Sequence, residues 1–154
     1  MKLLEDGERA TNPQTQFLRD LAKVILTYRC SGHRVLVMGD FNVQWDAGSD
    51  QRRLMENFLD DSGMVHAHAE LRPRDAVSTW WGPAGEQSWL DYVLVDKVSW
   101  GQRAVLQSSI ERSRPHGSDH SRVGALLDFR AMVGERSAAA ASGAADGGHD
   151  CMAD

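Results

Sequence analysis

Three short segments of the chain place acidic, amide and imidazole side chains beside apolar runs. In the first, Asp40 and Asn42 lie two residues apart, so an extended backbone would point both side chains the same way. A carboxylate and an amide side by side can bind a metal-bound water and a phosphoryl oxygen together. The alternative interpretation is an ordinary Asx turn, which Asp and Asn both favour.

The second and third segments offer a carboxylate and a histidine that could pair. Asp91 lies within the strand-like run Leu90 to Val95, where burying its charge is costly unless it is paired or hydrogen-bonded. Asp119 can hold a metal or a water, and His120 can act as a general base or stabilise charge on a phosphoryl group. Asp91 is the natural candidate to orient the His120 ring. Taken alone, each segment also fits a solvent-facing Asp on an edge strand or a loop with incidental charge.

The elements that must position these groups begin with a helix. Asn12 can cap this helix, Pro13 suits its first position, and Gly32 is a plausible stop signal. Apolar residues recur inside it at helical spacing and predict one buried face. The residues of that face are Phe17, Leu21, Val24, Ile25 and Tyr28.

A short apolar run, Val35 to Met38, follows the helix and predicts a strand that is buried on both faces. It ends at Gly39, where the backbone can leave the strand tightly. A helix that packs on a buried strand indicates a layered α/β domain. In such a domain, ligand sites form in the loops that leave the carboxyl ends of buried strands, which is where Asp40 and Asn42 lie.

Further elements are expected along the rest of the chain. A second amphipathic helix is predicted over 51–60 and ends at Ser62-Gly63, whereas 65–76 gives no clear pattern. Residues 82–85 predict a turn. Strands are predicted over 77–81, 90–95, 103–110 and 123–129.

Length and composition indicate one folded domain with a loose segment at each end. The chain has 154 residues, and we expect a polar leader at 1–11, a domain at 12–130 and a disordered Ala/Gly-rich tail at 131–154. The net charge of −5 argues against a protein that coats nucleic acid non-specifically. It does not exclude a nuclease, because a bound cation reverses the local field. With no signal peptide or transmembrane segment recognised, we expect an intracellular protein without a membrane partner.

Taken together and in order, the motifs resemble the C-terminal half of an endonuclease/exonuclease/phosphatase domain over about residues 13–129. The motifs are Gly39-Asp40-Phe41-Asn42, Thr79-Trp80, Leu90-Asp91-Tyr92 and Ser118-Asp119-His120. The resemblance implies a partial four-layer α/β sandwich of DNase I type, with the N-terminal half missing. It also implies a phosphodiester hydrolase that depends on Mg²⁺ or Mn²⁺ and acts on DNA or RNA. An endonuclease of a non-LTR retrotransposon is one branch of the family that would fit.

The resemblance also assigns roles to individual residues. Asp40 matches the aspartate that activates or positions the attacking water, and Asn42 matches the asparagine that helps to orient that water and the phosphate. Asp91 matches the aspartate that pairs with the terminal histidine. His120 matches that histidine, which contacts the scissile phosphate or acts as the base.

The remaining matches concern the metal and the wall of the site. Asp119 matches the aspartate associated with the metal. Thr79 and Trp80 match a substrate-binding wall, with core packing as the alternative for Trp80. The family's N-terminal glutamate, its principal metal ligand, has no counterpart here, and Trp89 replaces an arginine. We therefore expect that activity needs a missing N-terminal half or self-association.

Three other interpretations stay open at this stage. The chain could be an inactive remnant or interaction module that binds without turnover. It could belong to a phosphatase branch that acts on lipid or inositol phosphates. It could also be a zinc hydrolase that uses His66 with His68 and His116 with His120, which would predict stoichiometric zinc. In a truncated domain, an apolar sheet face should be left exposed.

Overall fold

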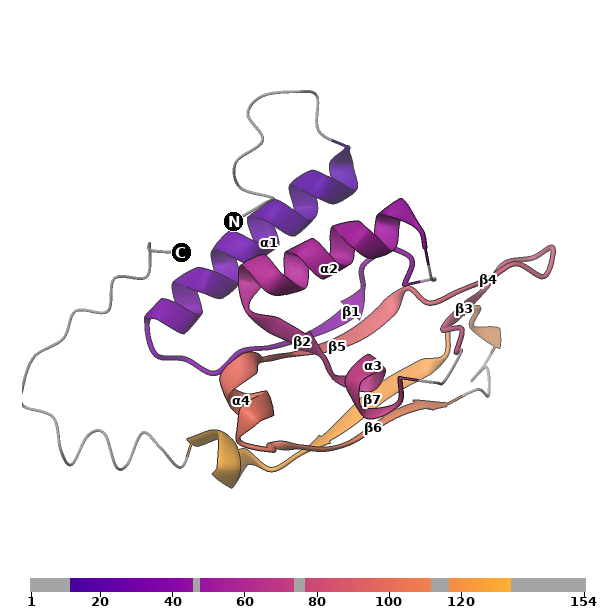
Figure 1. Ribbon diagram of the computed structural model, residues 1–154. Coiled ribbons are helices and arrows are strands. Elements are labelled where there is room, and N and C mark those ends of the chain that lie inside the picture. The colour runs from indigo at the N-terminus through magenta and orange to yellow at the C-terminus, as the bar shows by residue number, and fades with distance from the viewer. Residues whose placement is uncertain (1–11, 46–47, 74–76, 112–116, 134–154) are drawn as a thin grey trace, which may run out of the picture.

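The computed structural model describes residues 12–45, 48–73, 77–111 and 117–133 as a mixed α/β fold. The predicted leader at 1–11 and residues 134–154 of the tail predicted over 131–154 lie outside the described residues, whereas 131–133 are described and helical. Figure 1 shows α1 and α2 on one side of a central sheet and the β6–β7 hairpin on the other. In chain order the elements are α1 (Pro13–Cys30), β1 (Leu36–Asp40), α2 (Asp50–Ser62), β2 (Met64–His66), α3 (Ala67–Leu71), β3 (Trp80–Trp81), β4 (Gln87–Ser88), β5 (Asp91–Asp96), α4 (Lys97–Gly101), β6 (Val105–Glu111) and β7 (Arg122–Leu127).

The central sheet is antiparallel, with strand order β1-β5-β2. All six residues of β5 are buried, which confirms the predicted strand and excludes the edge position considered for Asp91. In the β1–β5 register, Asp40 lies opposite Asp91. The antiparallel pairing therefore brings the end of one strand and the start of another, far apart in sequence, to the same place.

Helix α1 begins as predicted, but it buries a different face. The Asn12 side chain accepts a hydrogen bond from the backbone N–H of Gln14, and Pro13 occupies the first turn. The predicted face was wrong at three positions, Phe17, Val24 and Tyr28, which are about half exposed. Residues of the neighbouring stripe pack into the core instead, because that stripe faces α2 and the sheet. Leu18 and Ala22 are the core residues of this stripe, and they are buried together with Ile25, which the predicted face had correctly included.

Strand β1 is a strand as predicted, but the expectation of burial on both faces was wrong. Leu36 is 39% exposed and Met38 50% exposed, whereas Val37, on the opposite face, packs against the core beneath α1 and α2. The reason is that Leu36 and Met38 lie on the same face as Val93 and Val95 of β5, and the apolar cluster that covers those two valines does not include the β1 residues. In addition, β1 is an edge strand, and among the described residues no strand pairs with its outer edge. The β1 strand also pairs antiparallel, unlike the parallel sheets in which such apolar runs are usual.

Two apolar clusters hold the layers together. The first fills the space between the helices and the sheet, and includes Phe41, Phe58 and Tyr92. The second lies between β5 and the β6–β7 hairpin, and includes Val93 and Val95. Since β5 contributes alternate residues to both clusters, it is the strand most enclosed by the fold, and Asp91 begins it.

The other elements agree in part with the sequence. Helix α2 was predicted and ends at Gly63, which adopts the left-handed conformation of a helix C-cap. The strand predicted over 77–81 shortens to Trp80–Trp81, and β2, β4, α3 and α4 were not predicted. The last strand ends at Leu127, and 129–133 are helical. None of the helices described here is both long and apolar enough to cross a membrane.

Candidate active site

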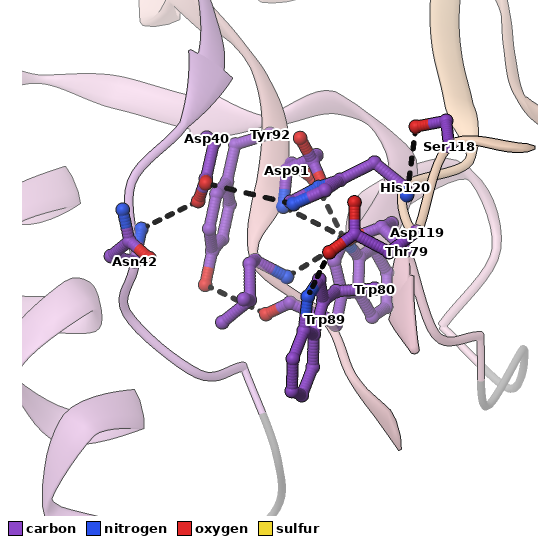
Figure 2. A network of polar contacts seen from close by, with 11 residues as sticks. Asp40, Asn42, Thr79, Trp80, Trp89, Asp91, Tyr92, Ser118, Asp119 and His120 are labelled. Atoms are coloured by element: carbon purple, nitrogen blue, oxygen red, sulfur yellow. Dashed lines mark hydrogen bonds and ion pairs between the residues drawn. The ribbon is translucent and has the colours of Figure 1, made fainter. Parts of the chain in front are cut away.

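His120 lies between two aspartates at the point where β1 and β5 meet (Figure 2). Its ring Nδ1 is 2.9 Å from Oδ2 of Asp91. Its Nε2 is 3.9 Å from Oδ2 of Asp40. The structure therefore brings together three residues from three separate sequence motifs, as the sequence predicts. The pairing of Asp91 with His120 supplies the partner that a buried aspartate needs.

Backbone pairing with β3 fixes the segment that carries His120. Trp80 and His120 form a β-bridge, and the N–H of Trp81 donates to the carbonyl of Asp119 at 2.9 Å. The N–H of Ser121 donates to the carbonyl of Thr79 at 2.7 Å. These contacts hold residues 119–121 against β3 through one isolated β-bridge, so the backbone on both sides of His120 positions the imidazole.

The electrostatic surroundings of His120 favour its protonated form. Partial burial lowers the His120 pKa, but the hydrogen bond that the ring donates to Asp91 and the charge of that carboxylate raise it, with smaller contributions from Asp40 and Asp119. The net result is a pKa above the usual value for histidine. An imidazolium held among three carboxylates suits a site that receives an anionic phosphoryl group.

Asp40 begins an Asx turn, so the extended backbone expected to point Asp40 and Asn42 the same way is not present. The Oδ1 oxygen of Asp40 accepts a hydrogen bond of 2.8 Å from the backbone N–H of Asn42, which has a φ of 51°. The Oδ2 oxygen of Asp40 faces His120. In Figure 2, Asn42 lies on the side of Asp40 away from His120. The side chain of Gln14 donates to the Asn42 carbonyl, which ties this turn to the start of α1.

Asp119 lies next to His120 and is hydrogen-bonded by a tryptophan. The indole Nε1–H of Trp80 donates to Oδ2 of Asp119 at 3.1 Å. Within the part of the chain that the structure describes, no group of three or more His, Cys, Asp or Glu side chains could hold a metal ion. The described residues thus offer a partial donor set. That fits Mg²⁺, which commonly binds one or two carboxylates and keeps several waters, but it does not form a closed cage.

Thr79 contacts the backbone at the start of β5, next to Asp91. The Thr79 side chain is fully buried, and its hydroxyl accepts hydrogen bonds from the backbone N–H groups of Leu90, at 2.9 Å, and Asp91, at 3.0 Å. Trp89, also buried, donates from its indole to the carbonyl of Asp91 at 3.0 Å. Sequence reasoning missed these contacts with the Asp91 backbone, and only the exchange of arginine for Trp89 had drawn attention to that position.

The histidines of the zinc interpretation do not form a site in the described residues. His66 and His68 are both buried, and His66 packs against the rings of Trp45, Trp89 and Tyr92. His116 lies outside the described residues. The predicted pairing of two histidine pairs around one zinc ion therefore finds no support among the residues that are described.

Comparison with known proteins decides the family. The model of the endonuclease/exonuclease/phosphatase family matches residues 5–120. The chain belongs to the endonuclease/exonuclease/phosphatase family. This confirms the resemblance drawn from the ordered motifs around Asp40, Asp91 and His120. No curated protein matches the chain.

Two solved structures share the fold. A 3'-5' exonuclease (NExo) from Neisseria meningitidis matches with a TM-score of 0.61 and 21% identity, over 73% of this chain and 52% of that one. A structure described as the 3' phosphatase NExo from Neisseria, bound to a product DNA hairpin, matches with a TM-score of 0.57 and 19% identity, over 79% and 57%. These matches confirm the predicted DNase I-like α/β fold. The chain spans about half the length of these solved structures.

Proposed function

We propose that this chain forms part of a metal-dependent phosphodiester hydrolase that acts on nucleic acid. The observation that carries the proposal is the placement of His120 between Asp91 and Asp40, with Asp119 adjacent. Membership of a family of nucleases and phosphatases supports it. A matching structure is described as a 3' phosphatase bound to a DNA hairpin, which favours nucleic acid as the substrate class.

The charged residues of the site have different proposed roles in hydrolysis. Asp91 holds the ring of His120 through Nδ1, so Nε2 is the nitrogen that can donate a hydrogen bond to a phosphoryl oxygen. The Oδ2 oxygen of Asp40, 3.9 Å from that nitrogen, can accept a proton from the attacking water. A bound Mg²⁺ or Mn²⁺ would neutralise developing charge on the phosphate, and Asp119 is the carboxylate expected to contact it.

The test is cleavage of supercoiled plasmid by the purified chain in Mg²⁺. Nicking should disappear with EDTA and in Asp119→Ala and His120→Ala variants. It should persist in Asp60→Asn, because the Asp60 carboxylate pairs with Lys97 on the exposed surface. Synthetic DNA with a 3'-phosphate would separate phosphatase from nuclease activity.

Two other results would redirect the proposal. A folded sample that binds DNA but shows no turnover would mean that the half carrying the missing glutamate is essential, and that this chain by itself is a remnant or an interaction module. Hydrolysis of an inositol phosphate with no action on DNA would move the substrate class to the phosphatase branch.

A further inference from the structure

The indole of Trp80 is aimed at the one carboxylate of the site that the proposed function assigns to the metal. Its Nε1–H donates to Oδ2 of Asp119 at 3.1 Å, across 39 positions of sequence. In Figure 2 the second oxygen of Asp119 points away from the indole. The contact thus uses one oxygen of the carboxylate and leaves the other for a ligand.

Backbone pairing fixes the position of Trp80, and the turn at Gly82 lies close against its ring. Trp80 pairs with Ser88 of β4 on one side and bridges to His120 on the other. A side chain at Gly82 would meet the ring, because a Cβ there would lie 2.7 Å from the Trp80 ring carbon Cη2 and 2.3 Å from the carboxylate of Glu86. The ring therefore fits against a turn in which a glycine leaves room for it.

An indole N–H suits the task of orienting a carboxylate. It is a donor only and does not titrate, so it cannot compete for a cation or withdraw when the pH changes. A hydrogen bond to one oxygen restricts rotation of the carboxylate about its terminal torsion, which is otherwise broad. Such outer contacts commonly fix the direction of metal-binding groups in proteins.

We propose that Trp80 is a positioning residue that fixes the Asp119 carboxylate so that its second oxygen faces the cation and the substrate phosphate. This inference rests on the proposed function, and it assigns to Trp80 a role other than packing or direct contact with substrate. Phenylalanine would preserve the aromatic wall but would lack the donor, so the two roles can be separated by one substitution.

The first experiment tests the contact without any metal. In a ¹H–¹⁵N spectrum, the indole signal of Trp80 is assigned by its loss in Trp80→Phe. In Asp119→Ala that signal should move toward the position of an indole without a protein acceptor, and its proton should exchange faster with solvent. A signal that is unchanged in Asp119→Ala overturns the proposal, whether or not the chain cleaves DNA.

The second experiment tests the consequence with Mn²⁺ as the probe. Trp80→Phe should weaken Mn²⁺ binding, measured by water-proton relaxation, by about 10-fold. The Mn²⁺ concentration for half-maximal cleavage should rise by the same factor. Trp81→Phe, which removes the neighbouring indole N–H, is the matched control and should leave both values near wild type.

The possible outcomes separate the two proposals. Unchanged Mn²⁺ affinity in Trp80→Phe with weaker DNA binding would make Trp80 a substrate-contacting wall and would overturn the positioning role. Unchanged Mn²⁺ and DNA affinities would reduce it to packing and overturn the role as well. A wild-type chain that binds no Mn²⁺ contradicts the proposed function, and positioning toward a cation falls with it, even if the indole signal shows that the hydrogen bond to Asp119 exists.

Discussion

At the scale of single residues, burial lowers the His120 pKa, and Asp91 is the main group that raises it. Because the His120 pKa is raised, the imidazolium persists to higher pH than in an ordinary histidine and is lost as the pH rises through that pKa. Asp91→Asn removes the charge of the partner, so the pKa of His120 should fall and the alkaline limit of activity should move to lower pH. The catalytic rate should fall by about 100-fold or more, which is the usual contribution of a positioned acid or base.

Titration of the His120 ring signals by NMR would measure this shift directly. Glu111→Gln, which removes an exposed carboxylate paired with Arg122, is the control and should leave the His120 titration unchanged. A His120 pKa that is the same in Asp91→Asn and in the wild type would show that Asp91 does not set it.

The pKa of His66 is shifted in the opposite direction from that of His120, and this shift makes the stability of the fold depend on pH. The His66 side chain is buried among aromatic rings, and neither ring nitrogen has a hydrogen-bond partner within the described part of the chain. Burial, with a smaller contribution from the charge of His68, lowers its pKa to about 3. The unfolded chain therefore binds a proton at His66 below pH 6.5 that the folded chain does not. Stability is fully present above that pH and falls as the pH drops toward 3.

Replacement of His66 by phenylalanine should remove this loss. Between pH 7 and pH 5 the wild-type free energy of unfolding should fall by about 2 kcal/mol through His66, and His66→Phe should lack that share. Urea unfolding at the two pH values measures it, with His33→Gln as an exposed control. An equal pH dependence in wild type and His66→Phe would contradict the burial of a neutral imidazole.

Individual site residues could be predicted from sequence to the extent that motif order identifies them. Asp40, Asp91 and His120 were selected because carboxylates and a histidine followed or interrupted apolar runs, and the fold brings them together. The contact between Trp80 and Asp119 could not be predicted, because it depends on how β3 pairs with a segment 39 positions away.

At the scale of elements, Thr79 links β3 to the start of β5. Its hydroxyl satisfies two backbone N–H groups, those of Leu90 and Asp91. Thr79→Val keeps the shape but leaves both donors without a partner, which should lower the free energy of unfolding by about 1–3 kcal/mol. Because the strand then moves relative to His120, the cleavage rate should fall too.

Thr79→Ser is the matched control, since it keeps the hydroxyl and removes only a methyl group. Urea unfolding and plasmid cleavage should show Ser close to the wild type and Val impaired in both. If Val and Ser were equally impaired, methyl packing rather than the hydrogen bonds would be the important contribution of Thr79.

The elements that sequence predicted well are those whose ends have local signals. Asn12 and Gly63 mark the limits of α1 and α2 through short-range backbone contacts. The strands β3 and β4 have two residues each, and they exist only because they pair with each other and with 119–121. Which face of α1 is buried also depends on its neighbours, which is why the stripe through Phe17 was assigned wrongly.

At the scale of the whole molecule, β1 exposes apolar side chains on one face of the central sheet. Leu36 and Met38 lie on the face of β1 that continues the buried face of Val93 and Val95 in β5. Exposed edges of this kind favour association through added strands. The expectation of an exposed apolar sheet face, made from the sequence, is met at this edge.

Met38→Lys should reduce association without unfolding the chain. Met38 is 50% exposed, so a lysine there can reach solvent, and surface changes of this kind usually alter stability by no more than about 0.5 kcal/mol. A charge on the open strand edge opposes both strand addition and apolar contact. The wild type should bind an apolar fluorescent dye and form larger species as concentration rises in sedimentation experiments. Met38→Lys should bind less dye and should form fewer of the larger species.

Val98→Lys is the control for this prediction, because Val98 is 39% exposed on α4 rather than on a strand edge. It should leave dye binding and sedimentation near wild type. A wild-type chain that is monomeric at all concentrations, binds no dye and unfolds sharply would show that the β1 edge is not an association surface. If Met38→Lys also lost nucleic-acid cleavage at low concentration, association through β1 would be part of how the site around Asp40 and His120 becomes active.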